Sequence, residues 1–248
     1  MNPFRVLDPT LSSQVRRGLC ALTVMTKVPQ AGKVKTRLVP PLTPDEAAEL
    51  NKCFLRDTAA TISSVIANNQ ACGIAAYTPP GVEATYADIL PADFNLLPQR
   101  GDSFGERLYF AAEDLIRCGF ESVCLIDSDS PTLPASNFLE AIRVLKMQGD
   151  RIVIGPCDDG GYYLIGLKTS HRELFEQIDW STERVFEQTR ARAREIGLET
   201  ELLAHGYDVD DAAGLHRLCK ELLSQSASDS VAPSTRKFLA KIVTQRRL

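Results

Sequence analysis

The stretch 122-SVCLIDSDSP-131 is the clearest strand signal in the chain, because an apolar run ends abruptly in aspartates. A short continuous apolar run is typical of a strand buried inside a parallel sheet. The apolar residues of 104–118 fall on one face of a predicted helix, which ends at Gly119. A further helix is predicted over about 134–147. The stretch therefore predicts a central strand that is preceded by one helix in the sequence and followed by another.

The same alternation extends along the rest of the chain. Strands are predicted at 19–25, 71–78, 94–99, 151–156 and 162–167 and near 201–210, and helices at 44–68, 84–90, 181–196 and 212–223. Thr43 is the predicted N-cap of the first of these helices, while Ser181 and Asp211 have capping chemistry before the last two. Strands alternating with helices predict an α/β fold, a single-domain three-layer α/β/α sandwich around a mostly parallel mixed sheet.

Three segments are expected along the 248 residues. Residues 1–17 lack periodicity and are interpreted as a loose leader, 18–223 as the α/β domain, and 224–248 as a linker followed by a basic helix. The last helix carries Arg236, Lys237, Lys241, Arg246 and Arg247, interpreted as a solvated helix that docks on the domain.

Composition narrows the class of protein. The net charge of −4 and the pI near 5.5 argue against a nucleic-acid or membrane-surface binder, and no apolar run is long enough for a membrane span. The seven cysteines are scattered without a C-x-x-C pair, which favours buried thiols in a reducing compartment. A cytoplasmic location is expected, and the sequence leaves open whether the chain forms a homodimer.

Two loops of opposite charge follow predicted strands. Between residues 26 and 37 lie four cations and no acid, Lys27, Lys33, Lys35 and Arg37, with Gly32 allowing close approach of a ligand to the backbone. Such a loop predicts a polyphosphate site, with a solvated basic loop as the alternative. Asp127 and Asp129 end the 122–126 strand and predict a divalent cation, with turn-capping aspartates as the alternative.

Three more segments are candidates for the same edge of the sheet. Asp210, in 208-DVDD-211, is expected beside Asp129 if both strands end there. Residues 157-CDDGG-161 form either a hairpin turn or a mobile loop over a second substrate. The glycines of 99-QRGDSFG-105 allow a base or ribose to approach the backbone.

Taken together, five motifs resemble a bacterial family of glycosyltransferase-like, or radical-SAM/selenodomain-associated, transferases. They are MTKVPQAGKVKTRL, QRGDSFGERL, CLIDSDSPTLP, GPCDDGGYYLIGL and DVDD, and they span about residues 20–240. That family is similar to the nucleotide-diphospho-sugar transferase superfamily, of glycosyltransferase type A fold. Phospholactate guanylyltransferase and the molybdenum-cofactor nucleotidyltransferases are its functional analogues.

The resemblance implies roles for individual residues. Lys33, Lys35 and Arg37 would contact nucleotide phosphates, and Asp127, Asp129 and Asp210 would hold the metal. Gln99 and Gly101 would lie near the nucleotide, and Asp159, Gly160 and Gly161 near the acceptor. The loop after the first strand has one glycine and three prolines where related enzymes have a glycine-rich loop, so side-chain cations must do more of the phosphate binding.

The leading hypothesis is a nucleotidyltransferase that uses Mg²⁺ or Mn²⁺. It would move NMP from NTP to a small phosphorylated or carboxylated acceptor, with Lys35, Arg37 and Asp129 as the catalytic residues and pyrophosphate as the second product. One alternative is a glycosyltransferase that uses an NDP-sugar donor with the same metal site. The other is a catalytically silent nucleotide-binding protein.

Overall fold

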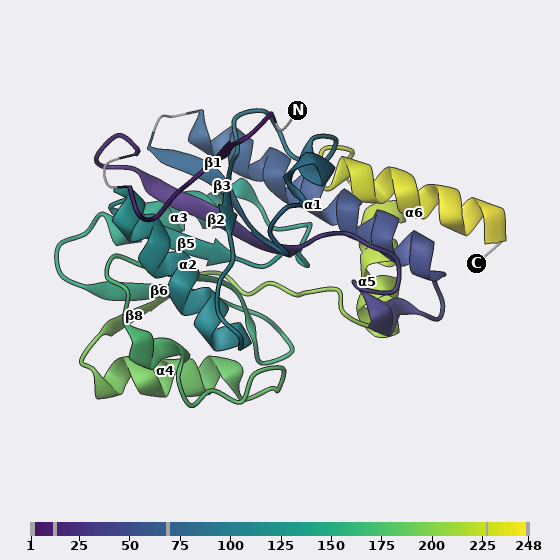
Figure 1. Ribbon diagram of the computed structural model, residues 1–248. Helices are drawn as coiled ribbons and strands as arrows, with labels where there is room; N and C mark the ends of the chain where they lie inside the picture. The colour runs from purple at the N-terminus through teal and green to yellow at the C-terminus, as the bar shows by residue number, and fades with distance from the viewer. Residues whose placement is uncertain (1–2, 12–13, 68–69, 227, 247–248) are drawn as a thin grey trace.

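An eight-stranded mixed sheet organises the molecule in the computed structural model, which describes residues 3–11, 14–67, 70–226 and 228–246 (Figure 1). The strands are β1 (Arg5–Val6), β2 (Cys20–Lys27), β3 (Ala71–Thr78), β4 (Asn95–Pro98), β5 (Ser122–Ile126), β6 (Arg151–Pro156), β7 (Tyr162–Leu167) and β8 (Glu199–Leu202). The α-helices are α1 (Pro44–Ile66), α2 (Phe104–Cys118), α3 (Ala135–Leu145), α4 (Val185–Glu195), α5 (Ala212–Leu223) and α6 (Pro233–Arg246). Short 3-10 helices are η1 (Thr36–Leu38), η2 (Glu83–Tyr86) and η3 (Arg172–Phe175).

The strand order is β1-β4-β3-β2-β5-β7-β6-β8. Neighbouring strands are parallel except where β7 pairs antiparallel with β5 and β6. From β2 the chain adds β3 and β4 on one side and then returns to place β5 on the other. The boundary between β2 and β5 is therefore the topological switch point, where open α/β sheets bind ligands beyond the carboxyl ends of their strands.

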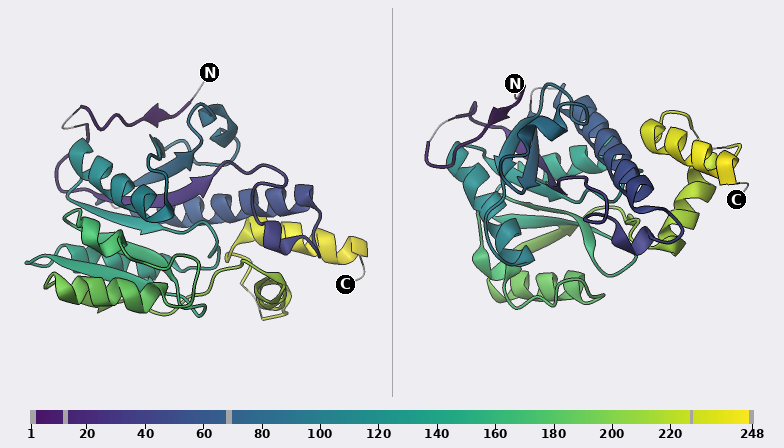
Figure 2. Two further views of the ribbon diagram at one scale, coloured as in Figure 1. Left: turned by 60° about the horizontal axis from the view of Figure 1, so that its bottom comes forward. Right: turned by 45° about the vertical axis from the view of Figure 1, so that its right-hand side comes forward.

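Helices cover both faces of the sheet (Figure 2). One core packs α1 and α3 against one face, and the other packs α2, η3 and α4 against the opposite face. The alternation along β5 assigns its side chains to these cores, with Cys124 and Ile126 in the first and Val123 and Leu125 in the second. The expected three-layer sandwich with a mostly parallel mixed sheet is confirmed.

A third apolar cluster joins α5 and α6 to η1 and the first half of α1. Asp57 of α1, only 3% exposed, accepts hydrogen bonds from the backbone N–H groups of Ser234 and Thr235 at 2.9 and 2.8 Å. A side chain of α1 therefore caps the first turn of α6, which fixes the predicted C-terminal helix against the domain. Arg247, which the sequence analysis counts in the basic tail, lies outside the described residues.

Several segment and helix boundaries in the structure differ from those predicted from the sequence. The leader is not loose throughout, because Arg5–Val6 pairs with β4 while Phe4 and Leu7 are buried in the two cores. The helix expected at 84–90 is only the 3-10 turn η2. The helix expected from Ser181 begins at Val185, and Ser181 has φ of 64° and does not cap it.

The helices at both ends of the domain were predicted well. Thr43 caps α1 in a reciprocal capping box with Glu46, and Asp211 caps α5 by accepting from the N–H of Gly214 at 2.8 Å. Among the described residues, no helix combines the length and apolar character required to span a membrane.

Candidate active site

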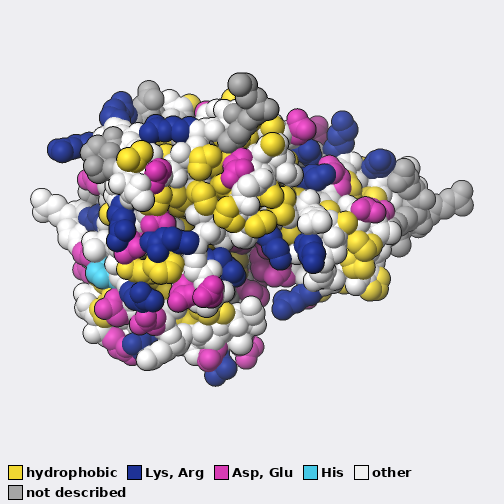
Figure 3. All heavy atoms as spheres, viewed as in Figure 1, with side chains coloured by type: hydrophobic (Ala, Val, Ile, Leu, Met, Phe, Trp, Pro, Cys, Tyr) yellow, Lys and Arg dark blue, Asp and Glu magenta, His cyan; other side chains and the backbone are white. Residues whose placement is uncertain are grey.

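Two adjoining pockets lie beyond the carboxyl ends of β2 and β5, at the switch point of the sheet. On the face presented by Figure 3, basic and acidic side chains lie next to one another. Arg37, Asp129 and Asp210 line both pockets, so these residues form the boundary between them.

The basic pocket has a volume of about 260 Å³ and is built mainly by the loop after β2. It is lined by Lys27, Lys33, Val34, Lys35, Thr36, Arg37, Asn51, Ser128, Asp129 and Asp210. The loop is folded by a turn in which the N–H of Lys33 donates to the carbonyl of Gln30, and then by η1. Leu38, fully buried, anchors η1 in the third apolar cluster, so the polar residues just before it face the pocket. Gly32 has φ of 71° and open space around its Cα, and it does not line the pocket.

The acidic pocket has a volume of about 360 Å³ and lies on the other side of Asp129 and Asp210. Its carboxylates are Asp127, Asp129, Asp159, Glu183, Asp208 and Asp210. Met25, Phe104, Leu108 and Trp180 supply an apolar wall, in which the Phe104 and Trp180 rings meet edge to face with centroids 5.0 Å apart. Among the described residues that line it, Arg37 is the one cation.

Lys35 connects two of the predicted metal ligands. Its Nζ lies 2.8 Å from Asp129 Oδ1, 2.8 Å from Asp210 Oδ1 and 2.8 Å from the carbonyl oxygen of Val209. The side chain is 4% exposed, and its ammonium group also lies 5.5 Å from the centre of the Phe54 ring. Three acceptors match the three N–H donors of an ammonium group. Lys35 therefore pairs with carboxylates in this structure, and its predicted contact with nucleotide phosphates stays a prediction.

The electrostatics of this triad favour the charged forms of Lys35 and Asp210, whereas burial and the charge of Asp210 leave the pKa of Asp129 raised in spite of Lys35. Burial lowers the pKa of Lys35, but the charges of Asp129 and Asp210 outweigh burial and leave that pKa raised. Burial raises the pKa of Asp210, but Lys35 outweighs burial and leaves that pKa lowered. The oxygens of Asp129 and Asp210 thus surround a position that holds positive charge.

Asp127 lies next to this position. Its Oδ2 accepts a hydrogen bond from the Ser130 hydroxyl at 2.7 Å, while its Oδ1 is buried with no hydrogen-bond partner among the described residues. Burial and the nearby charge of Asp129 raise the pKa of Asp127 well above its ordinary value. An unpaired buried carboxylate oxygen beside Asp129 and Asp210 is an unused ligand for a cation, and three carboxylates are a donor set that suits Mg²⁺ or Mn²⁺.

The 208-DVDD-211 motif reaches the site by a route that the sequence did not show. β8 ends at Leu202, and the chain continues in extended form with Leu203 N–H donating to Ile154 and Gly206 N–H to Pro156. Farther on, the N–H of Val209 donates to the carbonyl of Asp129 at 3.0 Å. This backbone bond places Asp210 beside Asp129, the juxtaposition expected from the sequence, although no strand ends there.

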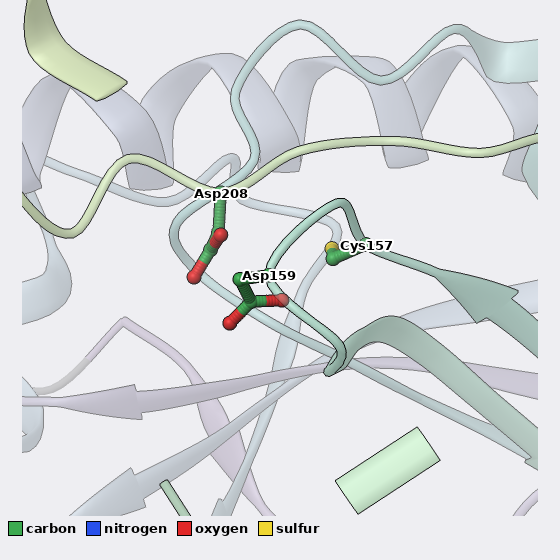
Figure 4. A group of neighbouring side chains, drawn as sticks. All are labelled: Cys157, Asp159 and Asp208. Atoms are coloured by element: carbon green, nitrogen blue, oxygen red, sulfur yellow. The ribbon is translucent and has the colours of Figure 1, made fainter. Parts of the chain in front are cut away.

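Asp208 is a site residue that the sequence analysis did not select. Burial raises its pKa to about 6, and the charges of Asp159 and Asp210 add to the shift. Figure 4 shows Asp208 with Asp159 and Cys157, which come from the turn after β6. One ligand atom from each of the three residues lies within 4.8 Å of the others. The alternation of aspartates in the DVDD motif was the available signal for Asp208. Cys157, 6% exposed, stands in the 157-CDDGG-161 segment but was interpreted with the other scattered cysteines as a buried thiol.

The turn at 157–161 is packed against the segment before α4. The N–H of Phe186 donates to the carbonyl of Gly160 at 2.9 Å, and a Cβ on Gly160 would lie 2.1 Å from the carbonyl oxygen of Glu183. Gly160 has φ of 85°, which also favours glycine. Asp159 and Gly161 line the acidic pocket together with Trp180 and Glu183, while Gly160 provides the close contact behind them.

Gln99 and Gly101 lie outside both pockets. The Gln99 amide donates to the carbonyls of Thr26 at 3.1 Å and Ala76 at 2.6 Å, so this side chain joins the ends of β2 and β3. Gly101 has φ of 106°, and a Cβ there would lie 2.8 Å from the Glu106 side chain. Each residue also has a structural role, Gln99 at the ends of β2 and β3 and Gly101 in the turn before α2, and their contact with a nucleotide stays a prediction.

Comparisons with known proteins support the fold. The model of a family described as "Uncharacterized protein conserved in bacteria (DUF2064)" matches residues 61–182. A crystal structure from Desulfovibrio desulfuricans G20, of a protein provisionally assigned as a nucleotide-diphospho-sugar transferase, is 29% identical with a TM-score of 0.79. The match covers 92% of this chain and 96% of that chain. A search of curated proteins finds no significant match.

Two more distant structures share the fold alone. The 4-diphosphocytidyl-2C-methyl-D-erythritol synthase from Anaerococcus prevotii DSM 20548 is 11% identical with a TM-score of 0.50, over 84% of this chain and 97% of that chain. The bifunctional IspDF from Campylobacter jejuni is 14% identical with a TM-score of 0.51, over 80% of this chain and 54% of that chain. The chain therefore has the nucleotide-diphospho-sugar transferase fold, of glycosyltransferase type A kind, as expected.

Proposed function

We propose that this protein is a metal-dependent nucleotidyltransferase. The observation that carries the proposal is the meeting of a basic pocket and an acidic pocket at Asp129 and Asp210, at the switch point of the sheet. The basic pocket suits a polyphosphate, and the acidic pocket suits a second substrate. The reaction then takes place where the two pockets meet.

The residues present fit a divalent cation. Asp127, Asp129 and Asp210 would hold Mg²⁺ or Mn²⁺, because Asp127 Oδ1 lacks a partner among the residues that the structure describes and the other two carboxylates already share a cationic group. When bound, such an ion neutralises charge on the phosphates and on the departing group.

The protein's own groups would bind and orient the reactants. Lys27, Lys33 and Arg37 hold the phosphates of NTP in the basic pocket. An oxygen of the acceptor attacks the α-phosphorus in line, a new P–O bond forms, and the bond to the β-phosphate bridging oxygen breaks. Pyrophosphate leaves with the electron pair of that bond. Positioning and charge stabilisation supply the rate enhancement, and no protein nucleophile takes part.

The lining of the acidic pocket bears on the charge of the acceptor. A phosphorylated or carboxylated acceptor is expected from the sequence, whereas the pocket proposed for it is lined by six carboxylates. An anionic acceptor would meet like charge on several sides.

A second candidate function is glycosyl transfer from an NDP-sugar. The observation that favours it is the similarity to the Desulfovibrio desulfuricans protein over 92% of this chain. The two reactions differ in their products, because nucleotidyl transfer releases pyrophosphate from NTP and glycosyl transfer releases NDP from the sugar donor. A third candidate, a catalytically silent nucleotide-binding protein, would bind nucleotide and release neither product.

Thermal unfolding with each common NTP and with UDP-, GDP- and ADP-sugars, in Mg²⁺, Mn²⁺ or EDTA, tests the proposal. A ligand at about 100 times its Kd adds about 2.7 kcal/mol of stability, or roughly 5–10 °C for a chain of this size. A metal-dependent shift with one NTP is the expected result. A shift with NDP-sugars alone would move the assignment to glycosyl transfer.

Asp129→Asn tests the site itself once turnover is measured as pyrophosphate release. We expect a fall of about 10²-fold or more, because the proposed cation that stabilises charge on the reacting phosphates loses one charged ligand. Asp88→Asn, an identical change at an exposed residue away from the pockets, is the matched control and should keep wild-type turnover. Normal turnover in Asp129→Asn would remove this residue from the mechanism.

A further inference from the structure

The acidic pocket carries more negative charge than a metal site alone requires. Asp127, Asp129 and Asp210 adjoin the proposed cation, and Asp159, Glu183 and Asp208 add three more acidic residues to the lining. Lys35, Arg37 and one divalent cation together would bring four positive charges to six carboxyl groups. The carboxyl groups around the pocket therefore outnumber the positive charges.

The Asp159 carboxylate is held in place by its own turn. Asp159 Oδ1 accepts the N–H of Gly161 at 2.8 Å, which fixes its carboxylate within the turn at 157–161. The turn is fixed in its own right against residues 183–186 by the Phe186–Gly160 hydrogen bond. A ligand that enters the pocket therefore meets negative charge that is held in place.

The apolar wall of the same pocket indicates the shape of the ligand. Phe104 is 45% exposed and meets Trp180 edge to face, and Gly105 packs so closely that a Cβ would lie 2.8 Å from the Trp180 indole nitrogen. Phe104 of α2 and Trp180 thus form one apolar surface in the same pocket as the carboxylates. Hydroxyl groups donate to carboxylates, and the C–H faces of a ring pack against aromatic side chains.

We propose that the acceptor held in the acidic pocket is a hydroxyl-bearing ring compound without negative charge, of the sugar or cyclitol class. The inference rests on the proposed function, because it assigns this pocket to the acceptor. An acceptor hydroxyl oxygen attacks the α-phosphorus, its proton passes to a pocket carboxylate and then to solvent, and pyrophosphate leaves as described above.

The test measures binding, so that it does not depend on turnover. Wild-type protein is loaded with Mg²⁺ and the α,β-methylene analogues of the four NTPs, which keeps nucleosides out of the assay. Saturation-transfer NMR then compares sets of neutral sugars and cyclitols with the phosphate monoester of each, and the sugars also with their uronic acids. We expect the neutral members to bind and their anionic partners to bind at least about 10-fold more weakly, because like charges oppose them.

Glu183→Lys reverses one charge of the pocket lining, and we expect it to raise the affinity for phosphate monoesters about 10-fold relative to wild type. Glu187→Lys makes the same charge change at an exposed position of α4 outside the pocket. It should leave the preference for neutral over anionic ring compounds unchanged. Tighter binding of the anionic members to wild-type protein, or binding of no member of any set, would overturn the proposal.

Pyrophosphate release separates this inference from the proposed function. Release from NTP with phosphate esters or uronic acids but with no neutral ring compound would overturn the acceptor class and leave nucleotidyl transfer standing. Binding of neutral rings without pyrophosphate release from any NTP would leave the ligand class standing and count against nucleotidyl transfer.

Discussion

At the scale of single residues, Lys35 decides the electrostatics of the site. It brings positive charge between Asp129 and Asp210 from a loop 90 residues or more away in sequence. Its backbone has φ of 49°, a left-handed conformation that turns the chain toward the carboxylates just before η1. A divalent cation and the Lys35 ammonium group therefore compete for the same two carboxylates, while phosphates in the basic pocket offer the ammonium group another partner.

Lys35→Met tests this competition. Removal of the ammonium group leaves carboxylates together without their partner, so we expect the free energy of unfolding in EDTA to fall by about 3 kcal/mol. Mn²⁺ should restore more stability in the variant than it adds to wild type, since the cation no longer competes with the lysine. Urea unfolding with and without Mn²⁺, and Mn²⁺ binding by EPR, measure both effects.

Lys33→Met is the control for this change, because Lys33 is an exposed lysine of the same loop with no carboxylate contact among the described residues. Its stability in EDTA should stay within about 0.5 kcal/mol of wild type. An equal Mn²⁺ gain in Lys35→Met and wild type would contradict the competition.

At the scale of secondary-structure elements, α6 depends on a cap from another helix. Ala232 precedes it with φ of 43° and has no side chain that can accept the first N–H groups. Asp57 of α1 takes that role with both of its carboxylate oxygens. Since α1 also carries residues next to the basic pocket, the C-terminal helix braces the helix that supports the site.

Asp57→Ala removes both hydrogen bonds and leaves two buried or half-buried N–H groups without an acceptor. We expect a loss of about 2–3 kcal/mol in the free energy of unfolding, measured in urea. Asp229→Ala, near the same helix end but with a side chain 93% exposed, should lose less than about 0.5 kcal/mol. Equal losses in the two variants would show that the cap does not anchor α6.

At the scale of the whole molecule, the sheet concentrates negative charge at one edge. β5, the turn after β6 and the segment before α5 each deliver carboxylates to the acidic pocket. A chain with a net charge of only −4 thus holds a strongly acidic site. Burial of these groups makes the stability of the ligand-free protein depend on pH.

Asp208 shows the sign of that dependence. Its folded-state pKa is raised to about 6, so the folded state binds its proton more tightly than the unfolded state does. The contribution of this group is therefore fully present below the ordinary aspartate pKa and is lost as pH rises through about 6. Asp208→Asn should be more stable than wild type at pH 7.5 and equal to it near pH 4, as thermal unfolding in EDTA would measure.

Asp88→Asn is the control at both pH values, because its carboxylate is exposed. A stability difference for Asp208→Asn that does not change with pH would contradict the raised pKa.

Local patterns were sufficient for most of the architecture. The apolar runs at 71–78, 122–126, 151–156 and 162–167 predicted β3, β5, β6 and β7 within a residue or so, and Thr43 and Asp211 predicted the starts of α1 and α5. Segments whose order comes from long-range contacts were missed. Arg5–Val6 is a strand because β4 lies beside it, and residues 203–209 are held by hydrogen bonds to β6 and to Asp129.

The amino-acid sequence by itself determined the fold class, the cationic loop and the aspartates after β5, because each depends on short runs of neighbouring residues. The tertiary structure alone decided the partners of those residues. It paired Lys35 with Asp129 and Asp210, added Asp208 and Cys157 to the site, and turned Gln99 to the ends of β2 and β3. The physical reason is that charge pairing and burial depend on distances between segments far apart in the chain, which no local pattern specifies.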